Sequence, residues 1–186
     1  MTRNSTPLRA ALTVATCAIL LSGCAESVTP PATPSPLGEL QTRPPLEQAR
    51  DDLLAATLQM QDELSALIPG MNWYNNGDPG RRNCSQRRFD GIGARAAYLG
   101  NFVSDMPIPD EAWPEALRRV QAIAAQHGAD QVSGYSDRPG DHSVEIYGTG
   151  NSISIYFGTQ LNTVIGPKTG CHLPAAKMPP KTTPTR

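Results

Sequence analysis

The stretch SVEIYGTGNSISIYF, residues 143–157, decides the fold of this 186-residue chain. Apolar residues alternate with polar ones on both sides of a glycine-containing turn at 148–151. Two runs with a period of two, joined by such a turn, are typical of an antiparallel β-hairpin. Residues 161–165 predict a third strand and residues 131–135 a shorter one before the hairpin, so this part of the chain predicts an antiparallel meander.

Two segments have the period of an amphipathic helix instead. Residues 46–68 carry apolar side chains at seven-residue intervals, and residues 110–127 begin with Asp110 as a cap and end before Gly128. The seven-residue interval is also that of a coiled-coil seam, but we interpret it as a core-facing stripe. The sequence therefore predicts an α+β fold with two layers, in which two helices pack on an antiparallel meander sheet.

The connecting segments give weaker patterns. Residues 71–88 hold several turn-forming residues in a row, and we expect a loop there with no strand or helix. Residues 96–103 predict a strand that is interrupted by Gly100 and Asn101.

The N-terminus has the features of a signal peptide over residues 1–23. Arg3 and Arg9 precede an apolar run at 10–21 that is shorter than the ~20 residues a membrane-spanning helix needs. The following tetrapeptide LSGC resembles the lipobox of bacterial lipoproteins. This resemblance implies cleavage before Cys24 and attachment of diacylglycerol and palmitate-type chains to that residue. An ordinary secretory signal with a chance cysteine at its cleavage site is the alternative.

The predicted anchor determines the location and the domain boundaries. Two or more acyl chains hold a protein durably on a membrane, so we expect this one on the extracytoplasmic face of the cell membrane. Residues 24–45 include six prolines and predict an extended tether. Residues 46–173 then form the globular domain, and residues 174–186 form a disordered tail.

The charge balance argues against nucleic acid as a partner. The full chain has 16 basic and 17 acidic residues, and removal of the signal peptide takes away two arginines and no acid. The mature chain then has a net charge of −3, whereas nucleic-acid-binding proteins normally show a basic excess.

Two cysteines remain for the mature domain after the signal peptide and the lipid site are set aside. They are Cys84 and Cys171, and an exported protein meets oxidising conditions. We expect them to form one disulfide. No C-x-x-C pair is present, so we expect no metal site.

The chain shows no catalytic signature. Its three histidines, His127, His142 and His172, are scattered, and we interpret them as surface or loop residues. The string GIGARA at 91–96 matches a dinucleotide-binding pattern, but no predicted strand precedes it, so we interpret it as a loop. We therefore expect neither an enzyme nor a cofactor.

Arginines gather in one segment, and this is the one surface feature with a candidate role. Arg81, Arg82, Arg87 and Arg88 lie beside the predicted disulfide, where fixed guanidinium groups would bind an anionic envelope component. A solvated loop with local ion pairs is the alternative.

The chain resembles the mycobacterial lipoproteins LppA, LppB and LppV. The resemblance rests on the lipobox, the two-cysteine domain, the segment Asn72-Trp73-Tyr74, the hairpin at 148–158 and the ending TGCHLP at 169–174. That family comprises envelope lipoproteins without an assigned biochemical activity. We expect a non-catalytic binding or scaffold module, with a lipid or small-ligand carrier and an envelope hydrolase as alternatives and with no protein partner identified.

Overall fold

The computed structural model describes residues 34–180, and residues 1–33 and 181–186 lie outside the described part. The signal peptide 1–23, the lipid site Cys24 and the tether up to residue 33 therefore stay predictions. The chain from Pro34 onward forms one compact unit. Its elements in chain order are α1 (Pro36–Thr42), α2 (Leu46–Leu67), β1 (Tyr74–Asn76), β2 (Gly80–Asn83), η1 (Arg87–Phe89), β3 (Arg95–Tyr98), β4 (Asn101–Ser104), α3 (Trp113–Gln126), β5 (Gln131–Arg138), β6 (Asp141–Tyr147), η2 (Thr149–Asn151), β7 (Ile153–Thr159), β8 (Thr163–Thr169) and η3 (Ala175–Lys177).

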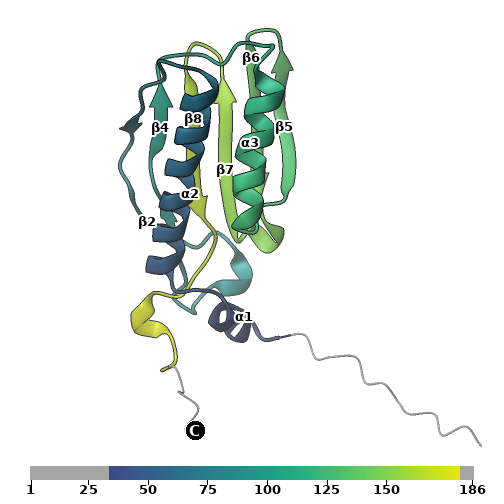
Figure 1. The fold of residues 1–186 in the computed structure, drawn as a ribbon. Coiled ribbons are helices and arrows are strands. Elements are labelled where there is room, and N and C mark those ends of the chain that lie inside the picture. Colours follow the sequence, from purple (N-terminus) through teal and green to yellow (C-terminus); the bar gives the residue numbers. More distant parts are fainter. Residues whose placement is uncertain (1–33, 181–186) are drawn as a thin grey trace, which may run out of the picture. The chain divides into compact units, whose positions relative to one another are not determined.

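The described strands form one antiparallel sheet of eight, with α2 and α3 lying along it (Figure 1). The order is β1-β4-β8-β7-β6-β5, and β3 pairs with both β2 and the end of β8. The last four strands follow one another as the predicted meander. The α+β fold predicted from the sequence is thus confirmed.

The pairing of β6, β7 and β8 places one side of the predicted hairpin in the core. Phe157 lies opposite both Val144 and Ile165, and Ile155 lies opposite Ile146. All five of these side chains are buried. The third strand differs from the prediction of 161–165, because β8 runs from Thr163 to Thr169 and Leu161 lies in the exposed turn before it.

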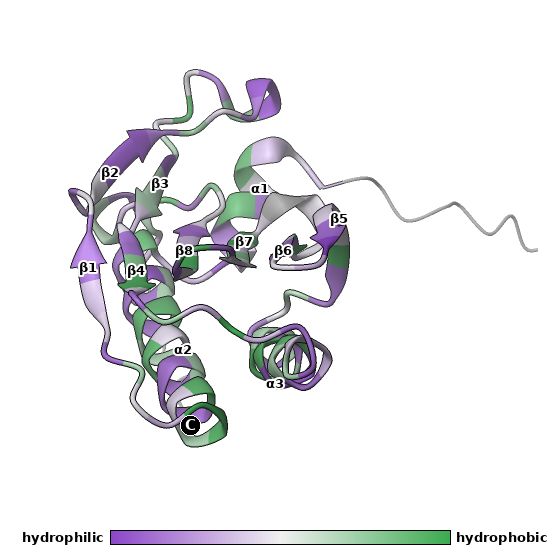
Figure 2. Cartoon of the chain, turned by 90° about the horizontal axis from the view of Figure 1, so that it is seen from above, coloured by the Kyte–Doolittle hydropathy of each residue, from purple (hydrophilic) through white to green (hydrophobic). Residues whose placement is uncertain are grey.

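Helices α2 and α3 lie on the same side of the sheet (Figure 2). They bury Leu53, Met60 and Leu64 of α2 and Ala116 and Val120 of α3 against the apolar face of the strands. The seven-residue spacing in α2 is therefore a core-facing stripe, as interpreted from the sequence. Ile68 caps the end of α2, and Pro69 and Gly70 come next, as expected for a helix end.

The predicted start of the second helix, at Asp110, is wrong. Helix α3 begins at Trp113, and Asp110 does not cap it. Instead, the Asp110 carboxylate accepts a hydrogen bond from the Gly140 backbone N–H at 2.7 Å and lies 3.0 Å from His142 Nε2. Asp110 thus ties the segment before α3 to the β5–β6 turn, a long-range contact that local sequence does not predict.

The expected strand 96–103 is present but divided. Tyr98 pairs with Lys168 of β8, and Phe102 pairs with Ile165. Four steps along this segment therefore match three steps along β8, which inserts one residue as in a β-bulge. Gly100 provides the required backbone conformation with φ of 86°, and the Asn75 side chain occupies the space that a Cβ would need.

The prediction of a structureless loop at 71–88 is wrong, because β1 and β2 form within it. Strand β2 pairs with β3 from Gly80 to Asn83, and β1 pairs with β4. Most of their side chains are exposed. Backbone hydrogen bonds hold these strands, so they show none of the apolar alternation by which strands are recognised in a sequence.

The tether and the tail are shorter than predicted. Residues Pro36–Thr42 form α1 rather than an extended segment, since the Ser35 hydroxyl caps the helix and Pro36 suits its first turn. Leu40 of α1 is fully buried beside Phe89 and Leu173. At the other end, the Ala175 backbone N–H donates to Glu47, so the chain stays in contact with α2 beyond residue 173.

His142 gives the fold a pH dependence that can be tested. Its ring is buried, stacks on Trp113 at 5.1 Å and lies between Asp137 at Nδ1 and Asp110 at Nε2. Burial lowers the pKa of His142, but the bonds to the two carboxylates together raise it above 6.5. The resulting stabilisation is complete below pH 6.5 and is lost as the pH rises through the higher folded-state pKa.

From about pH 6 to pH 8 we therefore expect wild type to lose free energy of unfolding relative to His142→Gln, because the opposite contribution of His172, whose pKa is lowered by burial, is common to both proteins. Urea unfolding at the two pH values measures both. The matched control is His127→Gln, because His127 is exposed at the end of α3. An equal fall in wild type and His142→Gln would contradict the assignment.

Candidate functional site

The face of the sheet away from the two helices, which we call the helix-free face, carries all five tyrosines of the chain. The strand register places there Tyr74, Tyr98, Tyr135, Tyr147 and Tyr156. Tyr135 and Tyr156 stack with their ring centroids 6.2 Å apart, and both are exposed. Tyrosine offers a rigid ring and a hydroxyl at low entropic cost, which suits a contact surface.

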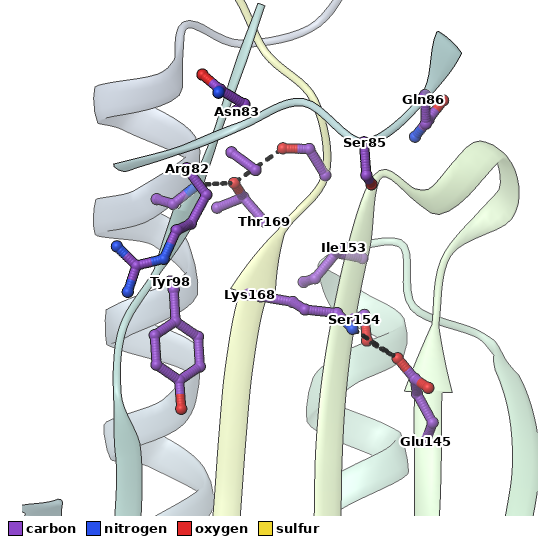
Figure 3. A pocket seen from close by; sticks show the side chains of 13 residues that line it. Arg82, Asn83, Ser85, Gln86, Tyr98, Glu145, Ile153, Ser154, Lys168 and Thr169 are labelled. Carbon is purple, nitrogen blue, oxygen red and sulfur yellow. Dashed lines mark hydrogen bonds and ion pairs between the residues drawn. The ribbon is translucent and has the colours of Figure 1, made fainter. Parts of the chain in front are cut away.

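A pocket of about 640 Å³ opens on this face (Figure 3). It forms where β3 diverges from β8 beyond the Tyr98–Lys168 pair, so the sheet is split there. The Thr169 hydroxyl spans the split by accepting from the Ala97 N–H at 2.8 Å and donating to the Gly170 carbonyl. The volume of the pocket lies in the usual range of small-molecule sites.

The disulfide builds the upper wall of this pocket. Cys84 follows β2, Cys171 follows β8, and the two are bonded with their Cα atoms 5.3 Å apart. The bond ties the segment after β2 to the segment after β8, and Ser85 and Gln86, which follow Cys84, line the pocket. The Gln86 amide also donates to the Gly150 carbonyl in the β6–β7 connection. The predicted cysteine pair is therefore present in the structure and shapes the site.

Glu145 is the single carboxylate among the residues that line the pocket. It accepts hydrogen bonds from the Ser154 and Tyr135 hydroxyls and lies 3.1 Å from the Lys168 ammonium. The bonds from Ser154 and Tyr135 outweigh partial burial and hold the pKa of Glu145 below its ordinary value. Both of its oxygens are thus already engaged, and the group stays ionised at neutral pH.

Two cations line the same pocket. The Arg82 guanidinium lies 6.0 Å from the centre of the Tyr98 ring, and no carboxylate within residues 34–180 forms an ion pair with it. Lys168 binds Glu145 with its ammonium, which has three donors, and the side chain is about half exposed. With the anionic Glu145 counted against these two cations, the lining of the pocket keeps one net positive charge.

The four arginines singled out in the sequence do not share one surface. Successive residues of a strand point to opposite faces, so Arg82 lies on the helix-free face and Arg81 on the helix side. Arg81 binds Glu47 of α2 at 2.8 Å, and Arg88 binds Glu39 of α1 at 2.7 Å. Arg87 is exposed in η1 and does not line this pocket. Of the four, Arg82 alone lines the pocket.

Two of the histidines are buried, contrary to the interpretation as surface or loop residues. His172 is 4% exposed, and its ring nitrogens face the Pro44 and Ser152 carbonyls. Burial lowers the pKa of His172. His142 is held between two carboxylates, as described above. Both rings therefore have structural partners at each nitrogen, and only His127 is exposed.

Sequence reasoning missed Tyr98, Glu145, Ser154 and Lys168 as site residues. The period-two pattern does indicate that Glu145 and Ser154 point away from the apolar face. Nothing local indicates that β3 reaches β8 or that the loop after β2 folds over them. These pairings depend on contacts between residues about 70 positions apart.

A profile of the LppA family, described as a lipoprotein confined to pathogenic Mycobacterium, matches residues 26–175. The chain belongs to the LppA family. The crystal structure of the lipoprotein LppA from Mycobacterium tuberculosis is similar in fold, with a TM-score of 0.64 and 20% sequence identity over 79% of this chain and 90% of that one. A DUF4853 family protein from Actinomyces odontolyticus gives a TM-score of 0.49 and 15% identity over 72% of this chain and 71% of that one. No curated protein sequence matches.

Two properties of the described part of this LppA-family protein bear on its site. None of the helices within residues 34–180 combines the length and the apolar character of a membrane-spanning segment. The same residues hold no group of three or more His, Cys, Asp or Glu side chains placed to bind a metal ion.

The disulfide provides a stability prediction. It closes a loop with a sequence separation of 87 residues, so opening it should lower the free energy of unfolding by about 4.6 kcal/mol in the chain-entropy treatment. We expect the double variant Cys84→Ser, Cys171→Ser to show this loss in urea unfolding under oxidising conditions. Reductant should lower the stability of wild type to that of the variant and leave the variant unchanged. Equal stability of the two proteins without reductant would contradict the prediction.

Proposed function

We propose that this LppA-family protein is a lipid-anchored, non-catalytic binding module on the extracytoplasmic face of the cell membrane. Its site is the pocket on the helix-free face, and its ligand is an anionic component of the cell envelope. The observation that carries this proposal is the pair Arg82 and Lys168, two cations in one pocket whose single carboxylate is already engaged.

The lipid anchor is supported by the sequence and by the family. The tetrapeptide at 21–24 ends an apolar segment with a positive start, and the family is described as a lipoprotein. Residues 25–33 would then connect Cys24 to the compact unit that begins at Pro34. A chain of this length keeps the domain close to the membrane surface, where envelope components are concentrated.

The lining of the pocket favours an acidic saccharide among anionic ligands. Arg82 and Lys168 would bind the acid group, carboxylate or phosphate. Ser85 offers a hydroxyl group for sugar hydroxyls, and the Tyr98 ring contributes apolar surface for the ring carbons. A sugar ring has an apolar face and a polar rim, so this mixture of groups matches both parts of it.

The titratable groups Glu145 and His142 already have hydrogen-bond partners within the protein, and this favours a binding function over a catalytic one. A general acid or base must hold or accept a proton at the reacting atom. Glu145 has a lowered pKa and accepts bonds at both oxygens, and His142 is buried with both ring nitrogens facing carboxylates. Neither group presents a free proton-transfer position toward the pocket.

The anchor is tested by Cys24→Ala. Without the acylated cysteine the protein should lose its firm attachment to the membrane, because the proposed acyl chains on Cys24 provide that attachment. Fractionation of host cells with an antibody to the protein measures the distribution, and mass spectrometry of the native N-terminus shows the modification. An unmodified N-terminus at another residue in the native protein would refute the anchor.

The ligand site is tested by Arg82→Gln combined with Lys168→Gln. We expect the full-length protein in detergent to bind an oligosaccharide of glucuronic acid, and the double variant to bind it about tenfold or more weakly. The difference should shrink as salt rises, because ions screen exposed charges. Isothermal titration calorimetry measures the affinity.

Arg87→Gln together with Lys177→Gln is the matched control, since both side chains are exposed and lie outside this pocket. It removes the same charge from the protein. Equal weakening by the control and by the site variant would mean that net charge, and not the pocket, determines binding.

A further inference from the structure

A second hollow lies on the helix side of the sheet, between the start of α2 and the strands β1 to β4. Its volume is about 360 Å³, and its lining is mainly apolar. The apolar lining residues are Leu46, Leu54, Pro79, Ala97, Leu99 and Phe102. Four of these are core residues that form its floor, whereas the Leu54 side chain of α2 is 38% exposed at its wall. An exposed leucine beside an apolar hollow indicates surface that a ligand would cover.

Two arginines and one carboxylate stand at the rim. Arg81 of β2 reaches Glu47 of α2 at 2.8 Å, and this ion pair spans the hollow from strand to helix. Glu47 is also fixed by the Ala175 N–H, which is the first cause of its lowered pKa. Arg50 lies one turn further along α2 and pairs with its neighbour Asp51 in solvent, where both side chains are more than half exposed.

We infer that this hollow binds the acyl chain of a single-chain acidic lipid, such as a fatty acid, with the acid group held by Arg50 and Arg81. The apolar lining supplies the site for the chain, since each methylene that leaves water contributes favourably. Among the residues that line the hollow, Arg50 and Arg81 are cations and Glu47 is the one anion, so a negative head group fits the rim when Arg50 leaves Asp51. An exposed ion pair such as Arg50–Asp51 is weak, so the Arg50 side chain can leave Asp51 and bind the ligand with little loss of free energy.

This inference is separate from the proposed function. Arg81 and Arg82 are neighbours in β2, but they serve hollows on opposite faces of the sheet. The acidic saccharide and the acidic lipid would therefore bind at different places, and either site can fail its test without the other. A peptide or a neutral lipid fits the rim less well, because neither satisfies its excess positive charge.

Photo-crosslinking tests the inference on the protein in its own membrane. A palmitate analogue with a diazirine in its chain is added to isolated envelopes that contain the full-length protein, and cross-linked peptides are identified by mass spectrometry. We expect cross-links within residues 46–54 and 97–102. An excess of palmitate should compete, and an excess of hexadecanol should compete about tenfold less well because it has no acid group.

Two leucines of α2 provide a matched pair of variants. Leu54→Arg places a charge on the wall of the hollow and should reduce cross-linking about tenfold or more. Leu58→Arg makes the same change one turn further along the helix, where the side chain is 48% exposed and does not line the hollow. It should leave cross-linking unchanged. Thermal melting of both variants shows whether they fold.

Three results would overturn the inference. Cross-links confined to other parts of the chain would remove the site, and equal cross-linking in the two leucine variants would remove the role of the hollow. Cross-linking that appears only in Cys24→Ala would show that the protein's own anchor occupies the hollow. Because the competition arm uses wild type alone, the acid-group claim is tested even if Leu54→Arg fails to fold.

Discussion

The alternation of side chains along β7 is the constraint on which both surfaces of this protein depend. Ile153, Ile155 and Phe157 point to the helices, whereas Ser154 and Tyr156 point to the helix-free face. A strand has a period of two, so a slip of one residue would exchange the two sets. The cost of exposing three large apolar side chains fixes the register. The position of Ser154 beside Glu145 follows from the same register.

The disulfide stabilises the end of the sheet that the main hydrophobic core does not reach. The main core lies between the two long helices and the strands, and the residues around Cys171 form a smaller, separate cluster with Leu40 and Phe89. Small clusters bury little surface and stabilise weakly. The Cys84–Cys171 bond holds the segment after β2 against the segment after β8. Helix α1 contributes Leu40 to the same cluster. The pocket wall at Ser85 and Gln86 therefore rests on a bond rather than on packing.

The sequence predicts those parts of the structure in which burial has a regular period. The hairpin at 143–157, α2 and most of α3 are of this kind, and the cysteine pair follows from the number of cysteines and the compartment. Strands β1 and β2 and helix α1 could not be predicted, because β1 and β2 bury almost no side chain and α1 buries Leu40 alone. The burial of His142 was missed for another reason. Its partners Asp110 and Asp137 come from separate elements, and only the folded chain brings them together.

The same limit explains why the arginines were misleading as a group. Five arginines within residues 81–95 suggest one basic surface when they are counted along the chain. The strand geometry separates Arg81 from Arg82, and the acids that pair with Arg81 and Arg88 lie in α2 and α1, far away in sequence. Two of the five positive charges are thereby neutralised within the fold. A strand that is polar on both faces, such as β2, is consistent with a position between two hollows, because each face then meets solvent or ligand rather than core. Its weak pattern in the sequence and its place at both candidate sites have one cause, which is the absence of a buried face.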